Sequence, residues 1–152
     1  MTTPSALQDG FTRNHRFLDE TFDKASGAVG KADGDLAPAA FRGFWDAIET
    51  HMTAEEECLF PVYETRHGPD NPLTGILRKG HRDLRGFFEE ISETIAGQDF
   101  EEAAALMDTV SQILAHHDEK EENEFYPAVA PLIPDPHDIL SRLIGPPLGG
   151  AP

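Results

Sequence analysis

The stretch that decides the fold is His51-Met52-Thr53-Ala54-Glu55-Glu56-Glu57-Cys58-Leu59-Phe60-Pro61. A second copy follows as His117-Asp118-Glu119-Lys120-Glu121-Glu122-Asn123-Glu124-Phe125-Tyr126-Pro127. Both copies read His-x-x-x-Glu-Glu-x-x-apolar-aromatic-Pro. They lie 66 residues apart, and the same offset relates His15 to His81. The sequence therefore predicts an internal duplication, in which each half holds one lone histidine and one His-x-x-x-Glu pair.

The composition is that of one acidic domain. The chain has 152 residues, with Lys+Arg 12 and Asp+Glu 28, which gives a net charge of −16. This charge argues against binding to nucleic acid or to anionic membranes, because both would repel the protein. The single cysteine excludes an intramolecular disulfide. No signal-peptide pattern and no apolar run of roughly 20 residues is visible, so we expect a cytoplasmic protein.

Apolar residues recur at helical spacing in four long stretches that are separated by short Gly- and Pro-containing connections. The predicted helices span about Thr3–Val29, Pro38–Arg66, Pro72–Ala96 and Phe100–Ala130. This pattern predicts an all-α, up-down-up-down four-helix bundle whose halves are related by a pseudo-twofold axis. Residues 1–131 form the bundle, and residues 132–152 form a C-terminal extension. In the extension we expect a short helix over Asp138–Ile144 and a disordered tail over Gly145–Pro152.

Polar side chains interrupt the apolar stripe of every predicted helix. Residues i and i+4 of a helix lie on one face, so the His and Glu of each motif project together into the core. The two lone histidines take core positions on the other two helices. A buried carboxylate is costly unless it is paired or bound to metal. We therefore predict a dinuclear metal site with the ligands His15, His51, Glu55, His81, His117 and Glu121.

The ligand types restrict the metal. Imidazole and carboxylate together suit iron, manganese or zinc, and no cysteine cluster is present for an iron–sulfur or Cys-rich zinc site. If each metal takes two His and both Glu bridge, a bridging oxo or hydroxo group makes five bonds on each metal. An open position then remains on each, reached from one end of the bundle, whereas a structural zinc site would be closed by four protein ligands.

Two similar motifs do not match. The metalloprotease pattern His-Glu-x-x-His is absent, and the ferritin-like pattern Glu-x-x-His has the opposite order. The lone histidines together with the two His-x-x-x-Glu motifs resemble the hemerythrin-like family, the HHE cation-binding domains, over about residues 8–130. The resemblance implies a non-haem di-iron centre in which Glu55 and Glu121 bridge two iron ions (Fe2+/Fe3+) and the four histidines are terminal ligands. It also implies binding of O₂ or a related small molecule, such as peroxide or NO, with manganese or zinc as substitutes for iron.

The chain departs from the oxygen-carrying members at the third helix. Those members pair two histidines one turn apart, whereas the residues four after and four before His81 are Arg85 and Leu77. The difference favours a more open, reactive centre over simple O₂ carriage. The alternative function is an iron- or oxygen-sensing module, or an iron-storage or repair module, without turnover. Enzymatic turnover and the electron donor stay open.

We expect the other notable residues in and beside the two motif copies to have structural roles rather than to act at the metal site. We expect Glu56 and Glu122 to lie at helix boundaries or in solvent rather than to contact the ligands. Cys58 is interpreted as a small buried hydrophobe. Tyr63 and Tyr126 flank the prolines, and we expect both to pack in the core rather than to act in redox or proton donation.

Three further histidines and two prolines complete the pattern. His116 should face solvent, because it points away from the face of its neighbour in the helix. His67 and His137 lie in predicted loops and supply a further ligand only if the chain folds back. Pro61 and Pro127 should each bend or end a helix soon after the site, because proline removes a backbone hydrogen bond.

Overall fold

The computed structural model describes residues 5–143, and every regular element in that range is helical. The α-helices are α1 (Ala6–Gly30), α2 (Leu36–Ala54), α3 (Phe60–His67), α4 (Pro72–Ala96), α5 (Phe100–Lys120), α6 (Tyr126–Val129) and α7 (His137–Leu140). Two π-helical turns, η1 (Glu55–Leu59) and η2 (Glu121–Phe125), and a 3₁₀ turn, η3 (Ala130–Leu132), join some of them. The all-helical prediction is confirmed for this range. No helix in it is long and apolar enough to cross a membrane.

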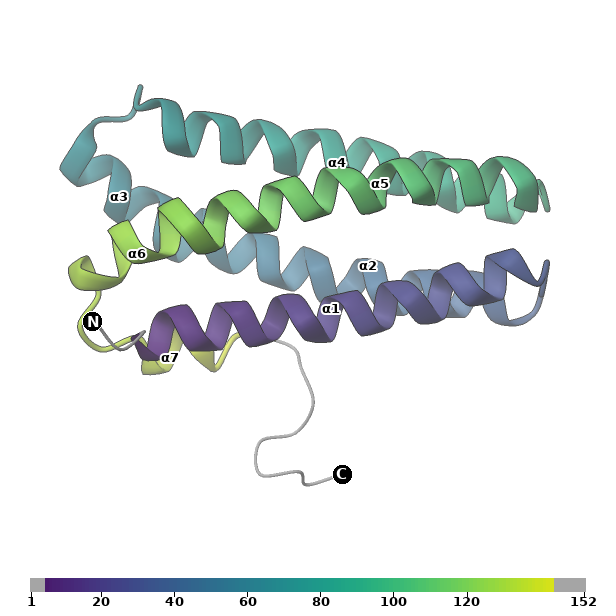
Figure 1. Cartoon of the computed structure of the whole chain (residues 1–152), viewed down its shortest axis with the longest axis horizontal. Helices are drawn as coiled ribbons and strands as arrows, with labels where there is room; N and C mark the ends of the chain where they lie inside the picture. The colour runs from purple at the N-terminus through teal and green to yellow at the C-terminus, as the bar shows by residue number, and fades with distance from the viewer. Residues whose placement is uncertain (1–4, 144–152) are drawn as a thin grey trace.

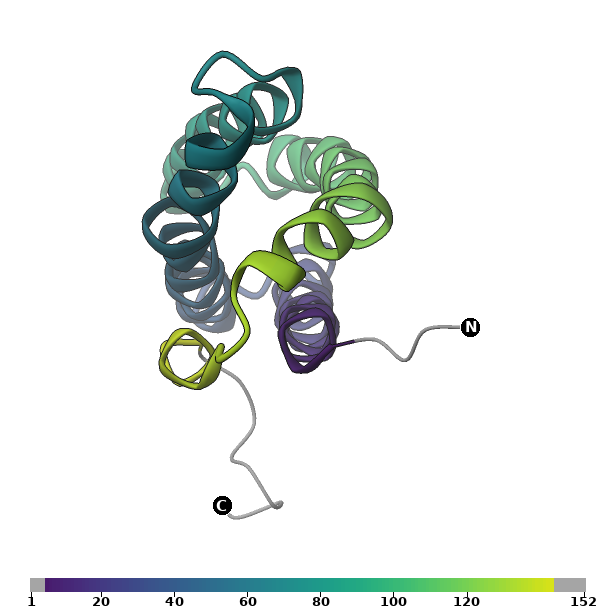
Figure 2. The ribbon, with the colours of Figure 1, turned by 90° about the vertical axis from the view of Figure 1, so that its left-hand side faces the viewer.

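Four long helical segments lie side by side and alternate in direction (Figure 1). They are α1, α2 continued through η1 into α3, α4, and α5 continued through η2 into α6. Figure 2 looks along them from the end that holds α6 and α7, and shows the four segments around a common centre. The pairs α1 with α2, and α4 with α5, are therefore antiparallel neighbours joined by short connections.

Side-chain caps set where two of these helices begin. Ser5 Oγ accepts the backbone N–H of Gln8 (3.1 Å), and Gln8 Oε1 accepts the N–H of Ser5 (3.0 Å), which is a capping box. Helix α1 therefore begins at Ala6, later than the predicted Thr3, which lies outside the described residues. Asn71 caps α4 by accepting the N–H of Thr74 (2.9 Å). These caps satisfy donors that have no partner inside the helix.

The π turns correct the prediction of two continuous helices. Each begins at a motif glutamate, Glu55 or Glu121, and each is closed by a bond from the fifth residue after the glutamate back to its carbonyl. The next residue is Pro61 or Pro127, whose ring would meet the carbonyl four residues earlier in a regular helix. The wider turn accommodates the proline, so the helix continues to His67, close to the predicted end at Arg66. After Pro127 the helix ends at Val129, as expected.

The buried apolar side chains form two clusters. The larger includes Leu18, Phe22, Phe41, Phe44, Ile48, Leu84, Phe88, Ile91 and Val110. The smaller includes Leu7, Phe11, Leu59, Phe60, Leu77, Phe125, Tyr126 and Val129. On each of the four long segments one histidine lies between residues of the two clusters. The core is therefore divided by a polar layer.

The C-terminal extension packs back onto the bundle as far as Leu143. Leu140 lies against Gly10 of α1, at a place that a side chain at position 10 would fill. Arg142 pairs with Glu57 (2.6 Å) and donates to Cys58 Sγ (2.8 Å). Cys58 is half-buried rather than fully buried as predicted. The helix expected over Asp138–Ile144 is found as His137–Leu140. Ile144 and the tail Gly145–Pro152 lie outside the described residues.

The buried aromatic side chains of the larger cluster should contribute strongly to the free energy of unfolding. Phe88 is fully buried, and its ring centroid lies 5.4 Å from that of Phe44, 5.9 Å from Trp45 and 6.2 Å from Phe41. Phe88→Ala should therefore lower the free energy of unfolding by about 3–5 kcal/mol. Phe87→Ala, at the half-buried neighbouring position, is the matched control and should lose clearly less. Denaturant unfolding measures both, and equal losses would contradict this description of the core.

Candidate metal centre

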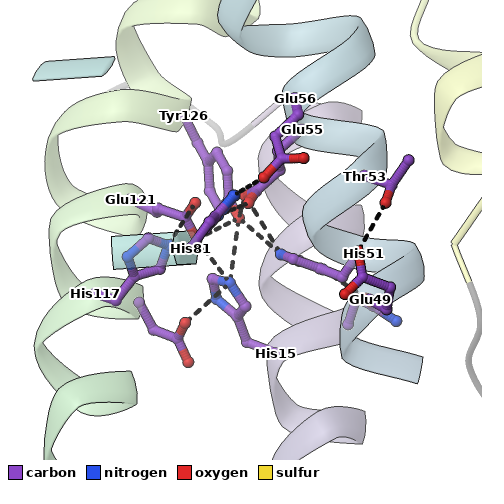
Figure 3. Close-up of polar contacts among 12 residues, drawn as sticks. His15, Glu49, His51, Thr53, Glu55, Glu56, His81, His117, Glu121 and Tyr126 are labelled. Atoms are coloured by element: carbon purple, nitrogen blue, oxygen red, sulfur yellow. Dashed lines mark hydrogen bonds and ion pairs between the residues drawn. The ribbon is translucent and has the colours of Figure 1, made fainter. Parts of the chain in front are cut away.

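The six predicted ligands meet in the polar layer (Figure 3). They form two groups of four that share both glutamates: His15, His51, Glu55 and Glu121, the first group, and Glu55, His81, His117 and Glu121, the second group. Within each group the four ligand atoms all lie within 4.8 Å of one another. The four long segments thus each contribute one imidazole, and the starts of η1 and η2 contribute the carboxylates.

Each glutamate presents one carboxylate oxygen to each group. The oxygen–Nε2 separations are 3.3 Å for Glu55–His51, 3.1 Å for Glu55–His81, 3.1 Å for Glu121–His15 and 3.2 Å for Glu121–His117. Two ligand atoms that lie about 2.1 Å from one metal ion, roughly at right angles, are about 3.0 Å apart. The separations are therefore those expected of ligand atoms that share a metal ion.

Buried polar atoms that lack a hydrogen bond supply a second test of whether these residues fit a metal. Within residues 5–143, four buried side-chain atoms have no hydrogen-bond partner: Glu55 Oε1, His81 Nε2, His117 Nε2 and Glu121 Oε2. They are the four ligand atoms of the second group. A buried polar atom without a partner costs about 1–3 kcal/mol. Because a cation would take a lone pair from each of these atoms, the residues present fit a bound metal ion.

Two neighbouring carboxylates orient the lone histidines. Nδ1 of His81 donates to Glu56 Oε2 (2.6 Å), and Nδ1 of His15 donates to Glu122 Oε2 (2.7 Å). Such bonds fix the ring so that Nε2 faces the centre. The prediction that Glu56 and Glu122 lie at helix boundaries or in solvent is therefore wrong, because each side chain reaches across to the histidine of another helix. The repeated Glu-Glu pair was the sequence signal for this role.

The two motif histidines are held differently. Nδ1 of His51 donates to Asn14 Oδ1 (2.6 Å). The ring of His117 packs against Gly80, where an added Cβ would come within 2.7 Å of Nδ1. Asn14 and Gly80 are also related by the 66-residue offset. Sequence reasoning missed both, although each directly precedes a lone histidine.

Tyr126 packs in the smaller cluster, as predicted, but its hydroxyl also reaches the centre, which was not predicted. Its hydroxyl donates to Glu55 Oε2 (2.6 Å) and lies 3.0 Å from Glu121 Oε1. Its counterpart in the first motif copy is Phe60. The sequence signal for this contact was the difference between the two motif copies, because only the second copy has a hydroxyl-bearing aromatic residue at this position.

The remaining histidines lie outside both groups. His67 is exposed and stacks on Tyr63, with ring centroids 4.2 Å apart. His137 is exposed in α7, and His116 is exposed on α5. Neither His67 nor His137 is thus placed as a further ligand.

Comparison with known proteins agrees with this geometry. The model of the hemerythrin HHE cation-binding domain matches residues 7–129. The chain belongs to this family. No curated protein and no solved structure matches the chain significantly. The matched range contains both lone histidines and both motif copies, so the cation-binding domain of the family includes the whole buried His/Glu cluster.

The two sides of this HHE domain differ in how they cover the centre. Arg85, four residues after His81, binds Glu49 and Glu56, with the closest N–O distance 2.7 Å in each case. The residues that correspond to Arg85 and Glu49 in the other half are Asp19 and Ala115. These line a groove of about 540 Å³ between α1 and α5. An ion-paired lid thus covers one side, and smaller or acidic residues leave the other side open.

The groove ends beside a small cavity at the centre. The cavity has a volume of about 10 Å³ and is lined by apolar side chains and by ligands of both groups. His15, Asp19, Leu114 and Asp118 line both the groove and the cavity. About one water-sized molecule fits in such a space. Access from one end of the bundle was expected, but this opening is on the side of the HHE domain, because the smaller aromatic cluster occupies the end.

Without metal, protons on the imidazoles offset part of the negative charge of the buried His/Glu cluster. Burial would lower the pKa of His81, but the nearby carboxylate of Glu55 and the hydrogen bond with Glu56 outweigh burial and raise the pKa to about 9. Burial is likewise outweighed at His15, where Asp118 and other carboxylates raise the pKa well above its usual value. Burial raises the pKa of Asp118 to about 7 against the opposing effect of His15. A metal ion must displace the imidazole protons to bind.

The metal-free HHE domain should therefore lose stability as the pH rises. His81 titrates near its usual 6.5 when unfolded and at about 9 when folded. Its stabilising contribution, on the order of 3 kcal/mol, is fully present below about pH 6.5 and is lost as the pH rises through about 9. The free energy of denaturant unfolding, measured in the presence of a chelator between pH 6 and 9.5, reports this loss. His67→Ala is a control that should follow the wild type. A metal-free profile that is flat over this window would contradict the arrangement.

Proposed function

We propose that this HHE domain holds two iron ions and binds or reacts with O₂, peroxide or NO. In this proposal Glu55 and Glu121 bridge the ions, His15 and His51 complete the first group, and His81 and His117 complete the second. The observation that carries the proposal is the sharing of both glutamates by two His₂Glu₂ groups, one of which consists of buried atoms without hydrogen-bond partners. Imidazole and carboxylate suit iron, and manganese or zinc could replace it.

A bound iron pair supplies one-electron and O₂ chemistry. The chain determines which molecules reach it. Leu18, Ile48, Leu84 and Leu114 line the small cavity, so they restrict a ligand to a small, weakly polar molecule and limit the entry of water. Asp118, at the end of the groove, can hold or release a proton on its carboxylate near neutral pH, because burial raises its pKa to about 7.

A reactive centre is favoured over a simple carrier. Arg85 is bound to two carboxylates, and Leu77 is buried in the smaller cluster, so neither neighbouring turn of α4 adds a ligand beside His81. The six side chains leave each ion with fewer than six protein bonds. Ligand positions that the protein does not fill let a small molecule bind and react.

A sensing, storage or repair module without turnover is the second candidate. It is favoured by the groove beside the centre, which is lined by Asp19, Asp23, Asp118, Glu119 and Glu122. Carboxylates of this kind would attract an entering cation. Such a module would exchange its iron readily with chelators, whereas a reactive centre would retain iron through repeated oxidation.

We further propose that the up-down-up-down bundle arose by internal duplication about a pseudo-twofold axis. Equivalent contacts support this interpretation. Glu56 binds His81 as Glu122 binds His15. Phe60 stacks on His81, with centroids 5.3 Å apart, as Tyr126 stacks on His15 at 5.7 Å. Each pair is related to the other by the 66-residue offset.

Metal content tests the dinuclear proposal directly. Anaerobic loading of the metal-free protein with Fe²⁺ should give two iron ions per chain by elemental analysis. Glu121→Ala removes a ligand atom from both groups and should abolish the second binding event, with helicity checked by circular dichroism. His67→Ala and His137→Ala are matched histidine controls and should keep two ions. One ion or none in the wild type would exclude the paired centre.

Reaction with small molecules separates a reactive centre from a carrier. The reduced, iron-loaded protein should be oxidised on stopped-flow mixing with O₂ or peroxide and should change its spectrum with NO, because ligand positions are open. Leu84→Phe, which fills the cavity beside the centre, should slow these reactions at unchanged iron content. Full recovery of the reduced spectrum after removal of O₂, over many cycles, would instead identify a carrier.

A further inference from the structure

One hydroxyl oxygen lies next to all four ligand atoms of the first group. Tyr126 is fully buried, and its Oη lies 2.6 Å from Glu55 Oε2 and 3.0 Å from Glu121 Oε1. It lies 3.2 Å from His15 Nε2 and 3.3 Å from His51 Nε2. Figure 3 shows the phenol ring entering between the two carboxylates. A side chain that only packs in the core would not need these four contacts.

The distances are those of a fifth ligand. Within the first group, Nε2 and carboxylate oxygen are 3.3 Å apart for His51–Glu55 and 3.1 Å apart for His15–Glu121. A square pyramid with bonds of about 2.1 Å places its apex about 3.0 Å from each basal ligand, and Oη lies at such distances. If Oη instead lay at the centre of a tetrahedron formed by the four ligand atoms, about 3.0 Å from each, the ligand atoms would lie about 4.9 Å from one another. The two measured pairs are much closer than that.

The second group receives no such hydroxyl. Its equivalent aromatic residue is Phe60, which stacks on His81 at the same interplanar angle, 30°, as Tyr126 on His15. The four ligand atoms of this group are the buried atoms that lack a hydrogen-bond partner among residues 5–143. The two groups therefore differ by one oxygen atom, although the rest of their ligands are equivalent.

We propose that Tyr126 is a ligand of the metal ion in the first group and binds it as a phenolate. This inference rests on the proposed metal centre. Binding replaces the phenolic O–H bond by an O–metal bond and releases one proton to solvent. The first ion then has five protein ligands and the second has four, so an external small molecule binds at the second ion. An anionic oxygen ligand also favours Fe³⁺ over Fe²⁺ at the first position.

The chain offers a sharp test, because Tyr63 and Tyr126 are its two tyrosines. Tyr63 stacks on His67 and lies in neither ligand group, so Tyr63→Phe is the matched control. The oxidised, iron-loaded wild type and Tyr63→Phe should both show a visible phenolate-to-iron charge-transfer band and phenolate modes in resonance Raman spectra. Tyr126→Phe should lose the band and these modes completely, with iron content determined in the same samples.

Two further results separate this inference from the proposed function. If two ions bind to the wild type without a phenolate signal, Tyr126 is a hydrogen-bond donor to Glu55, and the inference is overturned while the metal centre stands. If no metal binds, the proposed function fails, and this inference fails with it.

A measurement that needs no variant covers the case in which Tyr126→Phe does not fold. In wild-type protein made with ring-deuterated tyrosine, the Raman modes should shift to lower frequency if a phenolate is bound. Zinc, which is colourless, should produce the ultraviolet difference spectrum of one ionised tyrosine per chain. Unshifted modes, or a zinc complex without ionised tyrosine, would overturn the inference.

Discussion

Four imidazoles and two carboxylates meet in the middle of a helical core, and the rest of the structure depends on their burial. Uncompensated charges in such a place are strongly destabilising, so each must be paired, protonated or bound to a cation. The apolar residues are arranged around this requirement, because the polar layer separates the two clusters on all four long segments. Without metal, raised imidazole pKa values compensate the carboxylates; a cation would do so by direct bonds.

The π turns are the local feature that completes the layer. In a regular helix a residue five positions after another lies about 140° away around the axis, whereas a π turn brings the two onto one face. Tyr126 is five residues after Glu121, and its hydroxyl lies 3.0 Å from that carboxylate. The turn that accommodates Pro127 thus also directs an aromatic residue at the site. The equivalent π turn before Pro61, η1, directs Phe60 onto His81.

This geometry explains which parts the sequence could predict. The helical class and the convergence of the six side chains follow from i, i+4 spacing and from the repeated motif. The role of Tyr126 was missed because α-helical spacing turns it away from the site. Glu56 and Glu122 were missed because a position 100° round the helix was taken to face solvent, although another helix packs there. Asn14 and Gly80 carry no spacing signal of their own, since their roles depend on how neighbouring helices approach.

If the proposed duplication were exact, the two ligand groups and the approaches to them would be equal. The residues related by the 66-residue offset differ at two places beside the ligands: Arg85 corresponds to Asp19, and Phe60 to Tyr126. The first difference covers one side with an ion-paired arginine and leaves a groove on the other. The second adds a hydroxyl to one group only. Both changes lie around the ligands rather than among them. The two His₂Glu₂ groups therefore keep the same ligand types, while their surroundings make the two groups and the two approaches unequal.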